Sequence, residues 1–180
     1  MSVAVDELPL EEVYPLLEPG PVVLLTTRRD GRANVMTLSW HMMVDFVPPY
    51  IACVVSANDF SFAAMRSTRD CVLSIPSVDL AEKVVAVGNC SGRETDKFTQ
   101  IGLTPLPGQK VTAPLIQECF ANLECKVTDT RLVSQYNLFI LEVVKAWHDP
   151  AQGWPKTIHH RGHGAFVVDG RTIHLDSAMP

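Results

Sequence analysis

The sequence predicts a mainly β protein with a few short helices, arranged as a closed or nearly closed antiparallel β-barrel. Two Asp-Gly pairs, Asp30-Gly31 and Asp169-Gly170, each stand between apolar runs, which is the strongest short-range signal for a hairpin. Six or seven segments in all have the length and composition of strands. A hydrophobic content of 47% with 19% charged residues is typical of a folded core. We therefore expect one domain over residues 1–180.

The first third of the chain is predicted to consist of strands. Pro21 to Thr27 and Ala33 to Trp40 flank the first Asp-Gly pair and should pair as a hairpin. Pro49 to Val55 should form the third strand, because it begins directly after Pro48 and a strand start tolerates proline.

Helical signals are concentrated in the middle of the chain. Asn58 or Asp59 can cap a short helix, within which Phe60 and Phe62 are interpreted, like the methionines, as core residues. Glycines stand just past the ends of two later helices, where a left-handed residue is needed. In chain order we expect a helix over Phe60 to Arg66, a strand over Cys71 to Ile75, a helix over Asp79 to Val87 closed by Gly88, and a helical turn over Thr95 to Ile101 closed by Gly102.

The last third returns to strands. Thr104 to Pro114 is rich in proline and should be an irregular excursion. From Leu123 to Val127 apolar residues alternate with polar ones, as in a half-buried antiparallel strand, and Asn137 to Trp147 should be a long apolar strand. The second Asp-Gly pair should join strands over Ala165 to Val168 and Arg171 to Leu175.

Charge and cysteine content argue against several classes of function. The net charge is −5 and the longest basic run is Arg28-Arg29, whereas nucleic-acid binding needs clustered cations. Met1 to Glu12 is acidic and unlike a signal peptide, and the longest apolar runs have the length of strands. Five cysteines without CxxC spacing are typical of buried thiols in a reducing compartment. We expect a cytoplasmic protein that binds neither membranes nor nucleic acid.

One predicted strand carries an unusual set of polar side chains. Asn34, Thr37 and Ser39 stand on it beside Trp40. Short hydrogen-bonding groups next to an aromatic wall suit a flat, polar, phosphate-bearing molecule. The alternative is an ordinary strand whose polar residues face water while Trp40 enters the core.

Two further polar clusters follow neighbouring elements. Ser56 to Ser61 lies where a strand meets a helix, so its hydroxyls and the free N–H groups of the helix start can bind an anion. The alternative is an ordinary N-cap. Asn89 to Phe98 contains Lys97, which can supply one positive charge to a phosphate. The alternative there is a solvated loop in which a neighbouring carboxylate neutralises Lys97.

Short motifs follow one another along the chain in an order that is more specific than any one of them. They are Pro21 to Thr27, Asp30-Gly31, Asn34-x-x-Thr37-x-Ser39-Trp40, Pro48-Pro49, Ser56, Ser61, Asp96-Lys97-Phe98 and Gly102-Leu103. This ordered set resembles the flavin reductase-like family of FMN-binding split barrels, most of all its flavoredoxin-like branch. The resemblance covers about residues 21–175.

The resemblance implies a six-stranded antiparallel split β-barrel with its core over residues 21–175, assembled as a homodimer with FMN near the subunit interface. Trp40 would lie against the isoalloxazine ring, Lys97 would face the anionic side of the flavin, and Phe166 would help to wall the pocket. The implied cofactor-binding residues are Asn34, Met36, Thr37, Ser39, Trp40, Ser56, Asn58, Ser61, Lys97, Tyr136 and Phe166. We assign no catalytic or metal-binding residue.

The implied activity is that of a flavin reductase-type oxidoreductase, which moves electrons from NAD(P)H or a redox protein through bound FMN to an acceptor. One departure bears on the donor. Many NAD(P)H-dependent members have Gly-Asp-His or Gly-Asp-Ser-His where this chain has Ser134-Gln135-Tyr136. Tyr136 can donate a hydrogen bond and stack, but it cannot become cationic as histidine can. A non-catalytic FMN electron carrier therefore stays open as an alternative.

His159-His160-Arg161-Gly162-His163 is the other conspicuous motif. Three histidines could bind a metal, and His159 and His163 would share a face if the segment were helical. Gly162 and Gly164 argue against a helix, and the resemblance favours a loop that closes on the flavin pocket. A barrel that binds haem, a deazaflavin or a metal through His159, His160 and His163 stays open as a second alternative.

Overall fold

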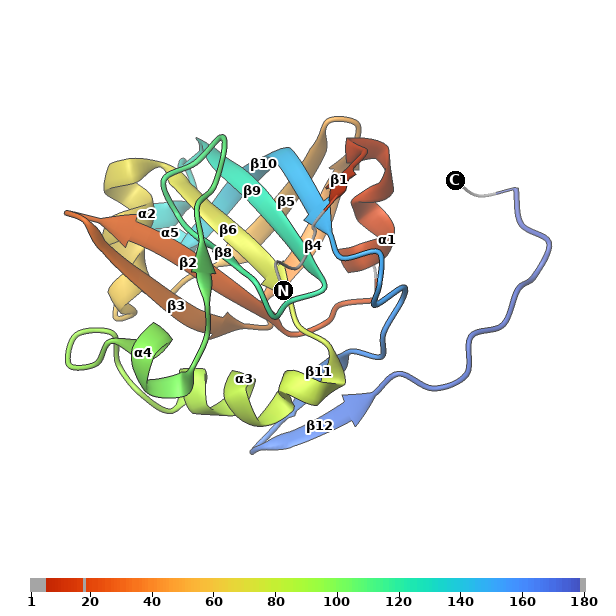
Figure 1. The fold of residues 1–180 in the computed structure, drawn as a ribbon. Coiled ribbons are helices and arrows are strands. Elements are labelled where there is room, and N and C mark those ends of the chain that lie inside the picture. The colour runs from red at the N-terminus through yellow and green to blue at the C-terminus, as the bar shows by residue number, and fades with distance from the viewer. Residues whose placement is uncertain (1–5, 18, 179–180) are drawn as a thin grey trace.

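The computed structural model describes residues 6–17 and 19–178, and its centre is one antiparallel sheet of eight strands. The hydrogen-bonded order is β3-β2-β6-β9-β10-β5-β4, and β1 pairs with β10 beside this path. The strands of this sheet are β1 (Asp6–Leu8), β2 (Val23–Arg29), β3 (Arg32–Leu38), β4 (His41–Phe46), β5 (Pro49–Val54), β6 (Asp70–Ile75), β9 (Ala121–Asp129) and β10 (Leu138–His148) (Figure 1).

The sheet curls into a barrel because its first and last strands are neighbours in the chain. β3 and β4 stand at opposite ends of the hydrogen-bonded order, yet only Ser39 and Trp40 separate them. So short a connection reaches only about 10 Å even when extended, so the ends of the sheet must adjoin. Across the described residues the order contains no β3–β4 ladder, which is the split in the barrel. The predicted fold class is confirmed, with eight strands in the main sheet where six were expected.

The turn at Asp30-Gly31 is the hairpin that the sequence predicts. Asp30 has φ of 51° and Gly31 has φ of 77°, the positive values that a tight two-residue turn requires. Arg29 pairs with Arg32 across the turn, and the ladder continues to Val23 and Leu38. This hairpin fixes the register of β3, and therefore which of its side chains reach the outer face of the barrel.

β4 is a strand that the sequence analysis did not predict. The side chains of Met42, Val44 and Phe46 are all exposed, while His41 and Met43 are half-buried. Because the outward side chains are apolar, the polar–apolar alternation that marks a half-buried strand is missing. The strand forms through its ladder with β5.

The second Asp-Gly hairpin is a wrong prediction. β11 (Ile158–Gly162) pairs with β12 (Ala165–Val168) through a turn at His163-Gly164. His163 and Gly164 have φ of 53° and 74°, so this pair makes the tight turn instead of Asp169-Gly170. Residues 171–175, expected as the returning strand, form no strand.

The carboxylate of Asp169 is hydrogen-bonded to residues at the start of β11, and Asp169 does not form a turn. Its carboxylate accepts hydrogen bonds from the N–H and the hydroxyl of Thr157, at 2.7 and 2.8 Å. His159 Nε2 lies 2.6 Å from the same carboxylate. These contacts hold Asp169 at the end of the β11–β12 hairpin, where it cannot turn the chain.

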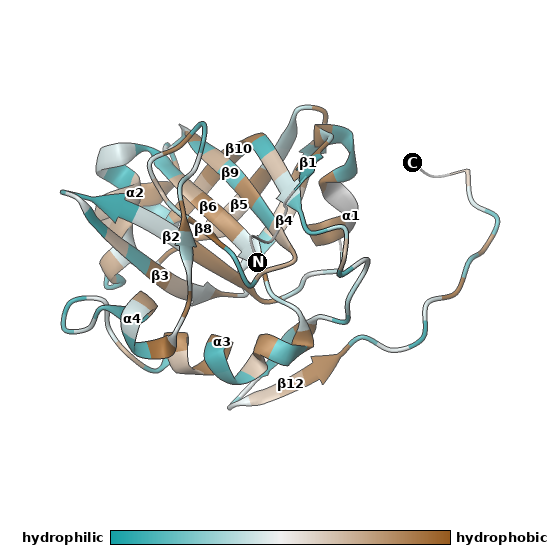
Figure 2. Ribbon diagram, in the orientation of Figure 1, coloured by the Kyte–Doolittle hydropathy of each residue, from teal (hydrophilic) through white to brown (hydrophobic). Residues whose placement is uncertain are grey.

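Buried apolar residues form a large cluster on the inner face of the barrel. Phe139, Leu141, Leu123, Leu73 and Leu25 are all fully buried in it. Buried and half-buried positions alternate along most of β10, and Figure 2 shows the matching change between apolar and polar residues along β9 and β10. This alternation is the period of two that a barrel strand requires.

Three helices lie outside β2 and β3 and frame the site. α2 (Phe60–Thr68) lies against β2 and β3, and α3 (Ala81–Gly88) and α4 (Lys97–Ile101) lie against β3 (Figure 1). They confirm the three predicted helical segments, α3 being preceded by η2 (Val78–Leu80). The remaining short helices are η1 (Leu10–Glu12), α1 (Tyr14–Leu17) and α5 (Val133–Tyr136). No helix within residues 6–17 and 19–178 is long and apolar enough to cross a membrane.

The excursion predicted over Thr104 to Pro114 is tied down by two buried carboxylates, Glu124 and Asp70, and Asp70 accepts hydrogen bonds from the N–H and the hydroxyl of Thr112. β7 (Pro105–Leu106) pairs with β8 (Leu115–Ile116) at its base. Glu124 accepts hydrogen bonds from the backbone N–H groups of Gln109, Lys110 and Val111 and from Trp147 Nε1. An irregular loop thus keeps its polar backbone groups satisfied.

Candidate functional site

A polar cleft of about 310 Å³ lies where β3, the start of α2, the loop after α3 and the start of α4 come together. We call it the polar cleft. Its lining comes from all three of the polar clusters that the sequence singled out. The lining residues are Asn34, Met36, Thr37, Asn58, Asp59, Phe60, Ser61, Val87, Gly88, Asn89, Cys90, Ser91, Gly92, Arg93 and Lys97.

Asn34 and Ser61 join β3 to α2 in the wall of the cleft. Asn34 Nδ2 donates a hydrogen bond to Ser61 Oγ at 2.9 Å, and both side chains are buried. Asn34 Oδ1 lies against Gly92, where an added Cβ would overlap this oxygen and stand 2.8 Å from Phe60 Cδ1. The loop after α3 can approach β3 this closely only because residue 92 is glycine.

Lys97 brings a buried positive charge to the cleft. It is the first residue of α4, whose N-cap Asp96 accepts hydrogen bonds from the N–H and the hydroxyl of Thr99. The Lys97 side chain is buried, and its Nζ donates to the Val87 carbonyl at 2.8 Å. Burial lowers the pKa of Lys97, and the nearby Cys90 and Asp59 act in the opposite direction. A buried ammonium with one carbonyl partner still has N–H donors with which to bind an anion.

The residues before α2 form a tight polar turn. The Ser56 N–H donates to Asp59 Oδ2 at 3.0 Å, and the Asn58 N–H donates to Ser56 Oγ at 3.2 Å. Asp59 is the N-cap residue of α2, and Asn58 lines the cleft. The turn holds the positive end of the α2 dipole at the cleft.

Met36 and Thr37 complete the wall on β3. Both side chains are half-buried. Thr37 donates its hydroxyl proton to the Val84 carbonyl of α3 at 2.6 Å, which leaves the oxygen free to accept. Thr37 Cβ and Oγ1 each lie 3.6 Å from the position a Cβ would take on Gly88, so α3 packs closely on β3.

The polar cleft thus brings together six of the residues proposed from the sequence: Asn34, Met36, Thr37, Asn58, Ser61 and Lys97. The other five do not line it in a single chain; they are Ser39, Trp40, Ser56, Tyr136 and Phe166. Their roles stay predictions.

Two of these five are exposed aromatic residues. The Trp40 side chain is 70% exposed between β3 and β4, so the alternative that placed it in the core is wrong. Tyr136 is 57% exposed at the end of α5. Phe166 differs from both, because it is half-buried and its ring lies 5.2 Å from the His160 ring.

The histidine motif lies on β11 and its turn, so no helix brings His159 and His163 together. His159 is engaged by Asp169 and by the Gly20 carbonyl, whereas His160 contacts Phe166. Adjacent strand residues point to opposite faces, so the two side chains diverge. Within the described part of the chain, no three His, Cys, Asp or Glu residues gather as a metal site would require.

Sequence reasoning missed two residues that the geometry makes prominent. Phe60, interpreted as core, is only half-buried and forms part of the cleft wall. Arg93 lines the cleft and donates from Nη1 to the Asn58 carbonyl at 3.0 Å, which links the loop after α3 to the turn before α2. The only signal for Arg93 was its place directly after Gly92 in the third polar cluster.

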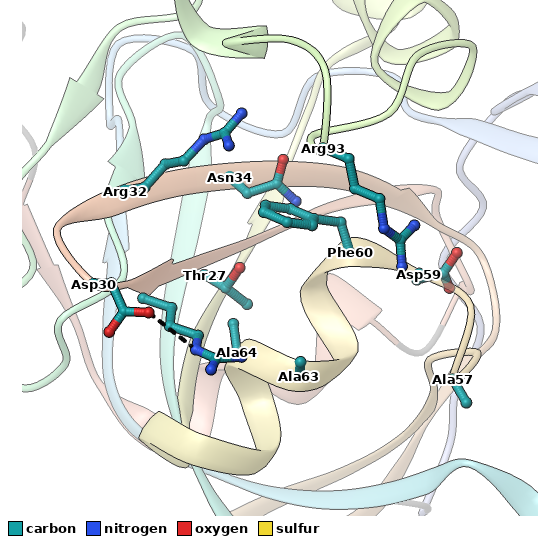
Figure 3. A pocket seen from close by; sticks show the side chains of 11 residues that line it. Thr27, Asp30, Arg32, Asn34, Ala57, Asp59, Phe60, Ala63, Ala64 and Arg93 are labelled. Carbon is teal, nitrogen blue, oxygen red and sulfur yellow. Dashed lines mark ion pairs between the residues drawn. The ribbon is translucent and has the colours of Figure 1, made fainter.

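A second cavity, of about 500 Å³, adjoins the polar cleft (Figure 3). The two share Asn34, Asp59, Phe60 and Arg93 in their linings. Thr27, Arg29, Asp30, Arg32, Ala57, Ala63 and Ala64 complete the second lining. We call it the arginine cavity.

Comparison with known proteins identifies the family. The sequence model of the flavin reductase like domain matches residues 17–166, and the chain belongs to that family. The Escherichia coli protein YddH is 33% identical over 172 residues, which is 88% of this chain and 91% of YddH. A protein of Archaeoglobus fulgidus is 28% identical over 142 residues, or 79% of this chain and 77% of that protein.

Solved structures give the same result. The FMN-binding domain of a flavin reductases-like enzyme from Shewanella baltica OS155 is 26% identical, with a TM-score of 0.91 over 98% of this chain and 100% of that chain. Flavoredoxin of Desulfovibrio vulgaris (Miyazaki F) is 25% identical, with a TM-score of 0.80 over 88% of this chain and 91% of that one. The predicted family and its flavoredoxin-like likeness are confirmed: the chain is a flavin reductase-like split barrel.

Proposed function

We propose that this protein binds FMN in the polar cleft and acts as a flavin reductase-type oxidoreductase, which passes electrons from NAD(P)H or a redox protein to an acceptor. One observation carries the proposal. The buried ammonium of Lys97 shares a polar cleft with the Asn34–Ser61 pair, at the start of α2. Burying a charge is unfavourable unless the charge is paired with one of opposite sign. Because the Lys97 ammonium bonds a neutral carbonyl, the cleft is suited to an anionic ligand.

The side chains of the cleft fit a phosphorylated flavin. An ammonium carries three N–H donors, and the Val87 carbonyl takes one from Lys97. Ser61 accepts from Asn34 and can still donate its hydroxyl proton to a phosphate oxygen. The N-terminus of α2 adds the positive end of its dipole.

Bound FMN supplies the redox chemistry, because its ring system accepts and releases hydride or electrons. The residues of the chain bind and position it. Lys97 favours negative charge in a site of low dielectric constant, where one charge counts for more than in water. Met36 and Thr37 form a wall of the cleft on β3, and we assign no general acid or base.

The segment at Tyr136 bears on whether NAD(P)H or a redox protein is the electron donor. This tyrosine stands where a histidine would provide a cation in many NAD(P)H-dependent members of the family. The alternative function, an FMN electron carrier without turnover, is favoured by this one substitution. Tyr136 is exposed, so it is accessible to a donor of either kind.

We also propose a homodimer. β4 is an edge strand, and Met42, Val44 and Phe46 on it are 62%, 50% and 43% exposed. Trp40 and Val47 continue this apolar strip at 70% and 66% exposure. A strip of this kind on an unpaired strand edge favours association with a second copy, and the dimer would cover Trp40.

The cysteines support a reducing compartment, which we propose to be the cytoplasm. All five are free thiols in the structure, and Cys53, Cys71, Cys119 and Cys125 are buried. Burial raises the pKa of Cys119 well above its ordinary value, which makes this thiol inert.

Titration with FMN followed by anaerobic reduction tests the function. We expect FMN to bind with a change in its visible absorbance and fluorescence. Rapid bleaching of the bound flavin by NADH or NADPH under nitrogen supports the reductase. Bleaching by dithionite or a protein donor alone supports the carrier. Failure to bind FMN at all would remove both functions.

A further inference from the structure

The β11–β12 hairpin carries the histidine motif, to which the function proposed above gives no role. The hairpin lies beside α3 (Figure 1). Directly before β2, the Val22 N–H donates to the Ile158 carbonyl at 2.8 Å. At the start of η2, the Val78 N–H donates to the Lys156 carbonyl at 2.7 Å. The hairpin therefore connects β2 to the segment that leads into α3.

The hairpin also packs against a wall of the polar cleft. Ile158 of β11 is fully buried in an apolar cluster with Val84 and Val87 of α3. Phe166 of β12 packs against the same cluster. Val87 lines the cleft, and its carbonyl accepts the hydrogen bond from Lys97 Nζ at 2.8 Å. Because close-packed interiors transmit displacement, a shift of the hairpin would move α3 and the carbonyl that orients Lys97.

His159 fastens the open end of the hairpin to the chain before β2. Its Nδ1 lies 3.1 Å from the Gly20 carbonyl oxygen, and its Nε2 lies 2.6 Å from Asp169 Oδ1. Gly20 lies between α1 and β2, whereas Asp169 follows β12. The side chains of His159 and Asp169 are 22% and 36% exposed, so their contact is partly shielded from water.

Both oxygens that face the His159 ring are hydrogen-bond acceptors. A neutral imidazole carries one N–H, so it could donate to only one of them and would point a lone pair at the other. The Thr157 hydroxyl, 3.3 Å from Nε2, does not provide the missing proton, because it donates to Asp169 Oδ2 at 2.8 Å. Both contacts are satisfied together only when the His159 ring carries a proton on each nitrogen.

The carboxylate of Asp169 provides the counter-charge. Burial by itself raises the pKa of Asp169, but the hydrogen bonds from Thr157 and His159 hold this pKa below its ordinary value. Asp169 is therefore anionic at neutral pH, and within residues 6–17 and 19–178 it is the one ion-pair partner of His159. The neighbouring Pro21 carbonyl lies 2.7 Å from Nε2 of His41. Burial lowers the pKa of His41, so this second imidazole brings no charge to the segment at neutral pH.

We propose that His159 is an imidazolium in the folded protein and acts as a positioning residue. It fastens the β11–β12 hairpin, and through the hairpin the α3 wall of the polar cleft, in the conformation that binds the flavin. His159 does not line the cleft, so it acts through Ile158 and α3. The effect on the flavin rests on the function proposed above, whereas the charge state of His159 does not.

Histidine-selective ¹⁵N NMR of the flavin-free protein tests the charge state. At about pH 7.5 an ordinary exposed histidine is mostly neutral. We expect both ring nitrogens of His159 to carry protons at this pH in the parent protein. In Asp169→Asn, which removes the counter-charge, one of them should lose its proton. A neutral His159 ring in the parent protein would overturn the proposal.

His159→Gln tests the positioning role. Glutamine presents one amide nitrogen and one oxygen, so it can donate at only one of the two contacts. His174→Gln is the matched control, because it makes the same change at an exposed residue beyond the hairpin. Hydrogen exchange of the Val22 and Val78 N–H groups, which bond the hairpin, should be about tenfold faster in His159→Gln and unchanged in the control.

FMN affinity should fall about fivefold in His159→Gln, because a hairpin that is open part of the time lowers the fraction of binding-competent protein. His174→Gln should bind FMN as the parent does. Parent-like exchange at Val22 and Val78, or parent-like FMN affinity, in a folded His159→Gln variant overturns the positioning role. If FMN fails to bind the parent protein, the proposed function fails, and the NMR and exchange measurements still decide whether His159 holds the hairpin as an imidazolium.

Discussion

At the scale of single residues, Lys97 is the strongest chemical feature of the site. Its ammonium is buried and has one carbonyl contact, to Val87. Taking an ammonium out of water is unfavourable, which is why burial lowers the pKa of Lys97. A protein that keeps such a group beside a cleft has a use for its charge, and an anionic ligand would relieve the cost of burial.

Lys97→Met should weaken FMN binding by about 1.5–3 kcal/mol, roughly ten- to hundredfold, because a charge-assisted contact is lost. The barrel should stay folded, since methionine fills a similar volume without charge. Lys83→Met is the control, because Lys83 bonds the Gly102 carbonyl and does not line the polar cleft. Equal FMN affinity in both variants would remove Lys97 from the site.

The affinity for FMN should also fall as the pH rises into the alkaline range. Free protein loses the Lys97 proton at its lowered pKa, below the value of about 10.4 for an ordinary lysine. The bound anionic ligand holds the Lys97 proton to a higher pH, so the affinity declines between the two pKa values. Lys97→Met should show no such decline, and a pH profile identical to that of the parent would contradict this role.

The position of a site residue could be predicted from the sequence when its contacts all come from the same chain. Asn34, Ser61 and Lys97 were named because each is polar, belongs to one of the three polar clusters and matches a family motif, and the fold brings them to one cleft. Trp40 matched a motif equally well, yet it is exposed. The sequence pattern does not show what covers an exposed side chain of this kind; in the homodimer that we propose, a second copy would cover it.

At the scale of elements, the loop after α3 controls the shape of the cleft. Gly92 lets this loop approach Asn34 closely, and Arg32 of β3 holds the loop through the Gly92 carbonyl at 2.6 Å. The loop thereby connects the polar cleft to the arginine cavity. A side chain at position 92 would push the loop away from both.

Gly92→Ala should destabilise the protein by about 1–3 kcal/mol and weaken FMN binding, because the new Cβ overlaps Asn34 Oδ1. Gly170→Ala is the control, since nothing lies within 4 Å of its Cβ position. Thermal unfolding and FMN titration measure the two effects. Unchanged values for Gly92→Ala would mean that the loop is free to move away from β3.

Elements that are determined by their own residues could be predicted from the sequence. Elements whose conformation depends on contacts with residues distant in the chain could not. The Asp30-Gly31 hairpin is local, and its two positive φ angles appear as the sequence predicts. Asp169-Gly170 carries the same dipeptide, but Thr157 and His159 hold the Asp169 carboxylate. β4 was missed because its exposed side chains are apolar, so the strand lacks the polar–apolar alternation that marks a half-buried strand.

At the scale of the whole molecule, the exposed strip on β4 predicts the assembly. Val44→Lys should convert a dimer into a monomer, because it places a charge in the centre of an apolar contact. Val85→Lys is the control, as Val85 is an exposed apolar residue on α3 away from the strip. Light scattering after size-exclusion chromatography measures the mass. A parent protein that is already monomeric, or a Val44→Lys variant that stays dimeric, would refute this interface.

The central claim, that the polar cleft holds FMN, is tested most directly by a crystal structure of the protein grown with FMN. We predict flavin density in the cleft, with a polar oxygen of the ligand on Lys97 Nζ and its phosphate beside Ser61 at the start of α2. Flavin bound at another surface, or an empty cleft at saturating FMN, would contradict it.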